Sequence, residues 1–243
     1  MLAPAPLDEL PGFRRRFRIT PAAGRICAEV EDDFHHMSVT VHHDGKRATA
    51  IEPKQPRAPW TTCPGAIEQL KESFTGIELA AFAAHGDKQA NCTHLFDLAL
   101  LAAAHAFEAD PLVYDILVSD PVDGKRRAEI RRNGVSTLGW TEAGMQLVEP
   151  AGFAGFTLVK MRPLIDSLEP AQQEAARLLR WGNMIANGRT IPLERQSDAT
   201  KMPPNCYTFQ PHRAIVAKRI GTIIDFSGGG VEPLQHPMDA AVR

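Results

Sequence analysis

The stretch Met37-Ser-Val-Thr-Val-His-His-Asp-Gly-Lys-Arg-Ala-Thr-Ala-Ile51 contains two alternating segments separated by Asp44-Gly45. In the first segment the apolar residues at 37, 39 and 41 lie on one face of a strand, and the polar residues between them, including His42, lie on the other. Asp-Gly between such segments is typical of a type I′ turn, because both turn residues need a positive φ. The stretch therefore predicts an antiparallel hairpin.

Similar signals extend outward from this hairpin in both directions. A second Asp-Gly pair at 123–124 predicts a second hairpin. Alternation predicts strands at 13–19, 25–31, 112–119, 126–132 and 135–141. Helical spacing predicts helices at 65–74, 93–108 and 169–185, the second capped by Asn91 or Thr93 and the third by Ser167. Strands and helices occur in blocks, which indicates an α+β fold: an antiparallel sheet built from hairpins and packed with about three main helices.

The chain of 243 residues, 44% of them hydrophobic, is long enough to bury a core. Residues 1–12 carry three prolines and show no periodicity, which predicts a flexible N-terminal arm. Residues 228–243 begin with three glycines, which predicts a frayed C-terminal tail. We therefore expect a single α+β domain over residues 13–227.

Composition excludes several classes of protein. A net charge of −2 and a pI near 6.5 argue against nucleic-acid and anionic-membrane partners. The chain has no apolar stretch of about eighteen residues to span a bilayer and no signal-peptide pattern at its start, so we expect a cytoplasmic protein. In that compartment the four cysteines stay reduced, which favours thiol or metal-ligand roles over disulfides. Edge strands of an antiparallel sheet favour a homodimer.

Two polar clusters, at 57–64 and 91–98, precede or open predicted helices. In the second, Cys92 lies in a first helical turn, where the helix dipole favours a thiolate. His94 and Asp97 are three residues apart on one helix surface, so the carboxylate can orient the imidazole as a general base. The structural alternative is that Asn91 and Thr93 cap the helix, Cys92 packs as a small hydrophobe, and His94 and Asp97 form a surface pair.

A metal site is a further hypothesis. Cys63 occupies a similar place before the helix at 65–74, so Cys63, Cys92 and His94, with a fourth ligand, form a candidate set for one zinc or iron ion. Their spacing matches no standard zinc motif. The alternative is a protein without a cofactor. P-loop and Rossmann glycine patterns are absent from the sequence, which disfavours a nucleotide cofactor.

Three motifs together resemble a known family. They are Pro59-Trp-Thr-Thr-Cys-Pro-Gly-Ala66, Cys92-Thr-His-Leu-Phe-Asp-Leu98, and Cys206-Tyr-Thr-Phe-Gln-Pro211 with Asp225-Phe-Ser227. In this order they are similar to the bacterial family catalogued as domain of unknown function 2889. The resemblance extends from about residue 13 to residue 227. It implies a cytoplasmic bacterial protein of one domain, found in organisms that degrade lignin-derived aromatic compounds.

That resemblance implies a small-molecule enzyme: a lyase that cleaves a carbon–carbon bond in a phenolic aromatic dimer and releases formaldehyde by acid–base chemistry. Such a reaction needs a base, a cation for the phenolate, an acid and an aromatic pocket. The matching candidates are His94 with Asp97 as base, Arg57 for the phenolate, and Tyr207 as acid. Candidate substrate-binding residues are Trp60, Phe96 and His42.

Two other classes of function stay open. The first is a non-catalytic scaffold in which Cys63, Cys92 and His94 hold zinc or an iron–sulfur cluster. The second is a regulatory protein that senses an aromatic ligand, which predicts stabilisation by the ligand without turnover.

Overall fold

The computed structural model describes residues 5–235 and contains, within that range, eight β-strands and five α-helices. Backbone contacts group these residues into two compact units, each built from segments that are distant in sequence. The β2–β4 unit comprises residues 17–112, 193–224 and 234–235, and the β5–β8 unit comprises residues 5–16, 113–192 and 225–233. The predicted single domain over residues 13–227 stays a prediction.

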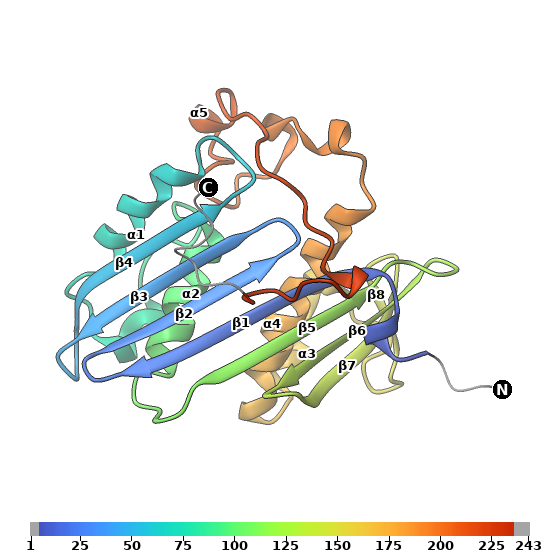
Figure 1. Cartoon of the computed structure of the whole chain (residues 1–243), viewed down its shortest axis with the longest axis horizontal. Helices are drawn as coiled ribbons and strands as arrows, with labels where there is room; N and C mark the ends of the chain where they lie inside the picture. Colours follow the sequence, from blue (N-terminus) through green and yellow to red (C-terminus); the bar gives the residue numbers. More distant parts are fainter. Residues whose placement is uncertain (1–4, 236–243) are drawn as a thin grey trace. The chain divides into compact units, whose positions relative to one another are not determined.

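The β2–β4 unit is an antiparallel sheet covered by two helices. Its strands are β2 (Arg25–Asp32), β3 (His36–His43) and β4 (Ala48–Arg57), in the order β4-β3-β2, with the C-terminal part of β1 (Gly12–Ala22) beside β2. Helix α1 (Ala66–Phe74) packs on β4, and α2 (Thr93–Ala104) packs on β2 and β3 (Figure 1). The unit also contains the short helix α5 (Pro211–Ala214).

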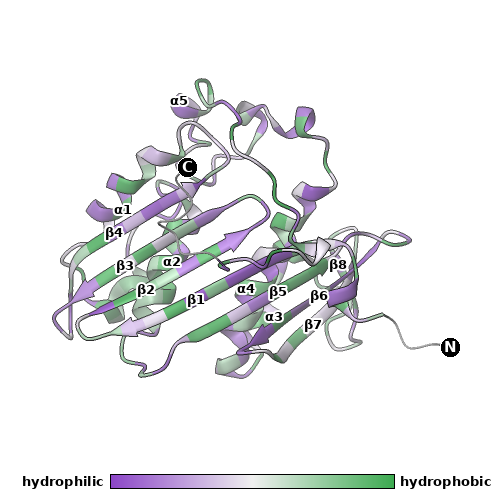
Figure 2. Ribbon diagram, viewed as in Figure 1, coloured by the Kyte–Doolittle hydropathy of each residue, from purple (hydrophilic) through white to green (hydrophobic). Residues whose placement is uncertain are grey.

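Alternation along the strands builds the core of this unit. Ile26, Ala28 and Val30 of β2 have no exposed surface, whereas the residues between them are only half-buried. Figure 2 shows hydrophobic and hydrophilic residues following one another along the strands. Helix α2 completes the core with Leu95 and Leu98, which are also fully buried. The period-two pattern therefore decides which face of the sheet receives α2.

The β5–β8 unit repeats the plan of sheet and helix. Its strands are β5 (Leu112–Ser119), β6 (Lys125–Arg132), β7 (Val135–Ala143) and β8 (Gln146–Glu149), each antiparallel to the next, with the N-terminal part of β1 beside β5. Helix α4 (Pro170–Ala186) packs on β6 and β7, and the short α3 (Arg162–Asp166) packs on α4. Trp140 donates its indole N–H to Asn183 at 2.7 Å, which joins β7 to α4.

The predicted α+β class with antiparallel sheet is confirmed, and α1, α2 and α4 are the three α-helices longer than five residues in the described part. The turn at Asp123-Gly124 has the two positive φ values, 50° and 73°, that a type I′ turn needs. The prediction of the same turn at Asp44-Gly45 is wrong. Only Gly45 has a positive φ, and the Asp44 carboxylate accepts the N–H groups of Lys46 and Arg47, each at 2.8 Å. The aspartate side chain thus closes a longer loop.

The helix ends differ from the predictions in instructive ways. Helix α2 ends at Ala104 rather than residue 108, because His105 leaves helical geometry and bonds to Glu108 through Nδ1 at 2.7 Å. Its N-cap residue is Cys92, and Asn91 bonds instead to Ser73 and to the Asp87 carbonyl. The N-cap of α4 is Glu169, not Ser167. In each case a tertiary or neighbouring contact takes the side chain that local rules assign to the cap.

The two predicted end segments are described only in part, since residues 1–4 and 236–243 lie outside the described range. From residue 5 on, Leu7 is buried, and Asp8 pairs with Arg131 at 2.7 Å. At the other end, Leu234 is buried, and its N–H donates to Glu31 at 2.7 Å. Within residues 5–235, every helix is too short or too polar to cross a lipid bilayer.

Gly12 is required by a close approach of two backbones in the β5–β8 unit. A Cβ at this position would lie 2.1 Å from the Val118 carbonyl oxygen and 2.8 Å from the Ser119 Cα. Because backbone atoms cannot swing aside, we expect Gly12→Ala to lower the free energy of unfolding by about 2–3 kcal/mol. Urea unfolding measures this change. Gly152→Ala is the control, since nothing lies within 4 Å of its Cβ, and equal effects of the two variants would contradict the steric argument.

Candidate functional site

The turn between β2 and β3 buries an aspartate bonded to a histidine. Asp32 is fully buried, and its Oδ1 accepts the N–H groups of Phe34 and His35 at 2.7 and 2.8 Å. The same oxygen lies 3.0 Å from Nδ1 of His35. A carboxylate oxygen only accepts hydrogen bonds, so this contact assigns a proton to Nδ1 and leaves Nε2 as the basic nitrogen of the ring.

A second histidine reaches this pair from α2. The rings of His94 and His35 stack with their centroids 3.9 Å apart and their planes at 29°. Nitrogen or oxygen atoms of Asp32, His35 and His94 all lie within 4.8 Å of one another, and in the part of the chain that the structure describes no other group of three such residues does so. Two positive rings this close repel, so the stacking disfavours a state in which both imidazoles are charged. The buried group is therefore suited to taking up and releasing a proton.

Arg57, at the end of β4, holds this turn in place. Its guanidinium donates to the carbonyl oxygens of Asp32, Asp33 and His35 at 2.6, 2.9 and 3.2 Å. It also pairs with Glu31 at 3.1 Å, and each of the two side chains is only 12% exposed. The predicted phenolate-binding cation thus satisfies the backbone of the turn that carries the histidine.

His36 is the next residue along and lies 3.6 Å from Glu31. Burial lowers the pKa of His36 from its ordinary value, and the Glu31 carboxylate offsets only part of this effect. The His36 ring is therefore neutral at pH 7, so the charge on this side of the turn comes from Arg57 and Glu31.

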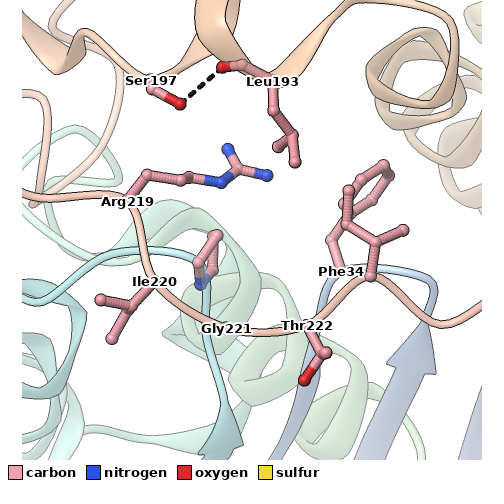
Figure 3. Close-up of a pocket in the computed structure, with 9 residues that line it drawn as sticks. Phe34, Leu193, Ser197, Arg219, Ile220, Gly221 and Thr222 are labelled. Carbon is pink, nitrogen blue, oxygen red and sulfur yellow. Dashed lines mark hydrogen bonds between the residues drawn. The ribbon is translucent and has the colours of Figure 1, made fainter.

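A pocket of about 290 Å³ opens beside the same turn (Figure 3). Its walls come from the turn, from the segment that follows β4 and from the segment that begins at residue 193: Phe34, Pro59, Leu193, Ser197, Arg219, Ile220, Gly221, Thr222 and Ile223. The Phe34 ring lies edge-on to His35, with the centroids 6.2 Å apart. Phe34 stands between Asp32 and His35 in the chain. The same turn therefore contributes a wall of the pocket and one ring of the histidine pair.

The structure brings one of the predicted catalytic residues, His94, into this group. Asp97 forms an ion pair with Lys88, at 2.5 and 2.6 Å. Tyr207 packs its hydroxyl against Gly65 and lies under the Arg213 guanidinium, 3.7 Å from the ring centroid. The backbone N–H of Tyr207 donates to the Asn91 carbonyl, just before α2. The role of the Tyr207 hydroxyl as an acid stays a prediction.

The predicted substrate-binding aromatic residues are parts of the core. Trp60 is 3% exposed and clusters with Cys63, Ala199 and Ala214. Phe96 is 5% exposed and packs on Phe74, with ring centroids 5.1 Å apart. His42 lies on the polar face of β3, where its Nε2 is 3.2 Å from Glu52. The rings that line the pocket are instead those of Phe34 and Pro59.

The predicted metal ligands Cys63, Cys92 and His94 do not form such a ligand group within residues 5–235, where His94 is grouped with Asp32 and His35. Cys63 packs against Trp60, and its Sγ lies 3.5 Å from the Thr208 hydroxyl. The surroundings of Cys92 disfavour the thiolate that was predicted there. Burial raises the pKa of Cys92 to about 12, and the thiols of Cys63 and Cys206 add to this rise. Desolvation outweighs the helix N–H groups, which lower the pKa.

We therefore expect Cys92 to resist alkylation in the folded protein. At pH 8 its thiol is protonated and buried, whereas Cys27 and Cys206 are partly exposed. Labelling with iodoacetamide followed by peptide mass mapping measures this difference. Cys206 is expected to react before unfolding and Cys92 only after it. Native labelling of Cys92 at the rate of Cys206 would show an accessible thiolate instead.

Sequence reasoning missed Asp32, His35 and Arg219. The signal for the first two is the run Asp32-Asp-Phe-His-His36 between two predicted strands, since a turn with so many ionisable residues is unusual beside apolar strands. Arg219 lies in a segment without periodicity and carries no local signal. Its position beside Trp60 depends on contacts across more than a hundred residues of chain.

Comparisons with known proteins leave the family open. No protein-family model matches the chain, and no curated protein matches it either. Among solved structures, the chain is similar to one described as a crystal structure of a viral glycoprotein, with 11% sequence identity and a TM-score of 0.23. That match covers 81% of this chain and 61% of the glycoprotein chain. A TM-score this low supports no conclusion, and the resemblance to domain of unknown function 2889 stays a prediction.

Proposed function

We propose that this protein is a small-molecule enzyme, a carbon–carbon lyase that acts on lignin-derived phenolic dimers and releases formaldehyde. The observation that carries the proposal is the stacking of His94 on His35, whose Nδ1 is held by the buried Asp32. This arrangement supports proton transfer, because the aspartate fixes the tautomer of one ring and the second ring shares its surroundings.

The reaction needs a base for one hydroxyl proton. The phenolate of the substrate first expels an oxygen leaving group from its benzylic carbon, which gives a quinone-methide-like state and releases water or an opened ether. His94 then takes the proton from the hydroxymethyl O–H of this intermediate. The O–H electron pair becomes the second C–O bond of formaldehyde, and the carbon–carbon bond to the side chain breaks. Its electrons form a carbon–carbon double bond in the side chain and restore the aromatic phenolate. The His94 ring is now positively charged. The neutral ring of His35, whose Nδ1 is held by Asp32, stabilises this charge from its stacked position.

A formaldehyde assay tests the function directly. A phenolic dimer with a hydroxymethyl side chain and a benzylic hydroxyl or ether group is expected to yield formaldehyde and the corresponding alkene in equal amounts. The same dimer with its phenol methylated is expected to be inert, because the ring can no longer form the quinone-methide-like state. Equal rates with both compounds, or no formaldehyde from the free phenol, would overturn the proposal.

A metal-binding scaffold is the second candidate, and the proximity of Asp32, His35 and His94 favours it. Imidazole and carboxylate are ligands that zinc and iron accept. A metal ion lies in the plane of a coordinating imidazole, however, so two rings stacked at 29° must tilt before both bind one ion. Elemental analysis decides: one equivalent of metal that is lost in His94→Ala would favour the scaffold. The cytoplasmic location, the homodimer and a chemistry without nucleotide cofactor stay predictions.

A further inference from the structure

The segment that carries Arg219 is fixed on both sides by backbone hydrogen bonds. Before it, the Thr61 N–H donates to the Lys218 carbonyl at 3.0 Å. After it, the Ile220 N–H donates to the Pro59 carbonyl, and the Ile224 N–H donates to the Asp33 carbonyl, both at 2.9 Å. The backbone position of Arg219 is therefore set before any ligand arrives, which reduces the ordering cost of binding.

The Arg219 side chain contacts an aromatic ring and also lines the pocket. Its guanidinium sits 5.4 Å from the centroid of the Trp60 ring, and Figure 3 shows the guanidinium extended toward Leu193 and Phe34. The Ser197 hydroxyl at the rim already donates to the Leu193 carbonyl at 2.5 Å. The other lining residues, which include Ile220, Thr222 and Ile223, carry no charge, so Arg219 is the one charged side chain among the residues that line the pocket.

Charge balance at Arg219 points to an anionic ligand. Within residues 5–235 the guanidinium forms no ion pair and no hydrogen bond, and its interactions are the contact with Trp60 and a long-range effect of Cys63. Partial burial lowers the pKa of Arg219 from its ordinary value, which is the direction expected of a cation that lacks a counter-ion. A ligand that brings a negative charge would restore this balance.

The shape and walls narrow the class of anion. A volume of about 290 Å³ is at the small end for ligand pockets and suits one aromatic ring with a short side chain. The Phe34 ring and Pro59 offer apolar surface to such a ring. One guanidinium with its planar fork of donors matches a carboxylate, which is planar and carries one charge, better than a doubly charged phosphate.

We propose that this pocket binds the carboxylate of a small aromatic acid, with the carboxylate on Arg219 and the ring against Phe34 and Pro59. If the pocket belongs to the active site of the proposed lyase, the substrate is an aromatic dimer that carries a carboxylate, and this part of the inference rests on the proposed function. Binding itself is independent of turnover, so it is measured without the reaction.

Calorimetric titration with benzoate and with benzamide tests the inference on the full chain. Benzoate is expected to bind at least about tenfold more tightly than benzamide, because charge-assisted hydrogen bonds are stronger than neutral ones. Arg219→Gln is expected to remove this preference, and Arg219→Lys to retain only part of it, since lysine lacks the planar fork. Arg195→Gln is the matched control: Arg195 is exposed in the neighbouring segment and does not line the pocket.

Three results would overturn the inference: equal binding of benzoate and benzamide, unchanged preference in Arg219→Gln, or binding of acetate as tight as that of benzoate. If Arg219→Gln fails to fold, the comparison of the three probes on the native protein and on Arg219→Lys still decides. Benzoate binding without formaldehyde release from any dimer would support the pocket and contradict the lyase. Formaldehyde release without a preference for benzoate would contradict the pocket alone.

Discussion

Replacing Arg57 with methionine is expected to lower the free energy of unfolding by about 3–5 kcal/mol, the cost of leaving a nearly buried carboxylate and three carbonyl groups without their cationic partner. The guanidinium satisfies three carbonyl groups of the β2–β3 turn and the nearly buried Glu31. Methionine fills a similar volume but donates no hydrogen bond. The loss of stability therefore comes from polar groups of the turn that lose their hydrogen bonds, and not from a change in packing.

Urea unfolding of the two proteins measures this effect, and Arg47→Met is the matched control. Arg47 also donates to a carbonyl, that of Gly76, and pairs with Glu78, but its side chain is 51% exposed. Water replaces its partners, so we expect a loss under about 1 kcal/mol. If Arg57→Met unfolds like the native protein and only its substrate binding weakens, Arg57 holds the phenolate and does not hold the turn.

Replacing His94 with alanine is expected to reduce formaldehyde release by about 10²- to 10⁴-fold, the usual contribution of a general base. The reason is the loss of the ring that receives the hydroxyl proton. The buried neighbour His35 is held by Asp32 and cannot move into its place. The measurement is the initial rate of formaldehyde release with saturating phenolic dimer, together with circular dichroism to verify folding.

Asp97→Asn and Asp32→Asn together distinguish which of the two carboxylates supports His94 as a base. Asp97 binds Lys88 at 2.5 Å, so its replacement is expected to lower the rate less than about tenfold. Asp32→Asn keeps the shape of the side chain but removes the charge beside His35, and we expect a larger loss of rate. A loss in Asp97→Asn equal to that in His94→Ala would make Asp97 the residue that orients the base.

Local patterns predicted the elements well and their ends less well. The strand 25–31 was recognisable because Ile26, Ala28 and Val30 alternate with polar residues, and β2 follows this pattern. The turn at Asp44-Gly45 was misjudged, because a type I′ turn and a loop closed by an aspartate carboxylate share the same two residues. The ends of helices and strands depend on single hydrogen bonds, and the periodicity of the sequence does not predict these bonds.

The candidate site was predictable only where one residue carried its own signal. His94 was identified from its place at a helix start, and the structure places it in the buried group. Cys92 was identified by the same signal but has the opposite acidity, because the effect of burial on a thiol exceeds that of a helix end. The degree of burial depends on neighbours that are distant in sequence.

The sequence by itself determined the antiparallel α+β architecture, because alternation and helical spacing are local and persist in the folded chain. Tertiary structure alone decided which residues meet at the site. Asp32 and His35 reach His94 because α2 packs on β2 and β3, and Arg219 reaches the pocket through backbone bonds to the segment around Trp60. These contacts join residues more than fifty positions apart, and they form only when the apolar faces that bring them together are buried.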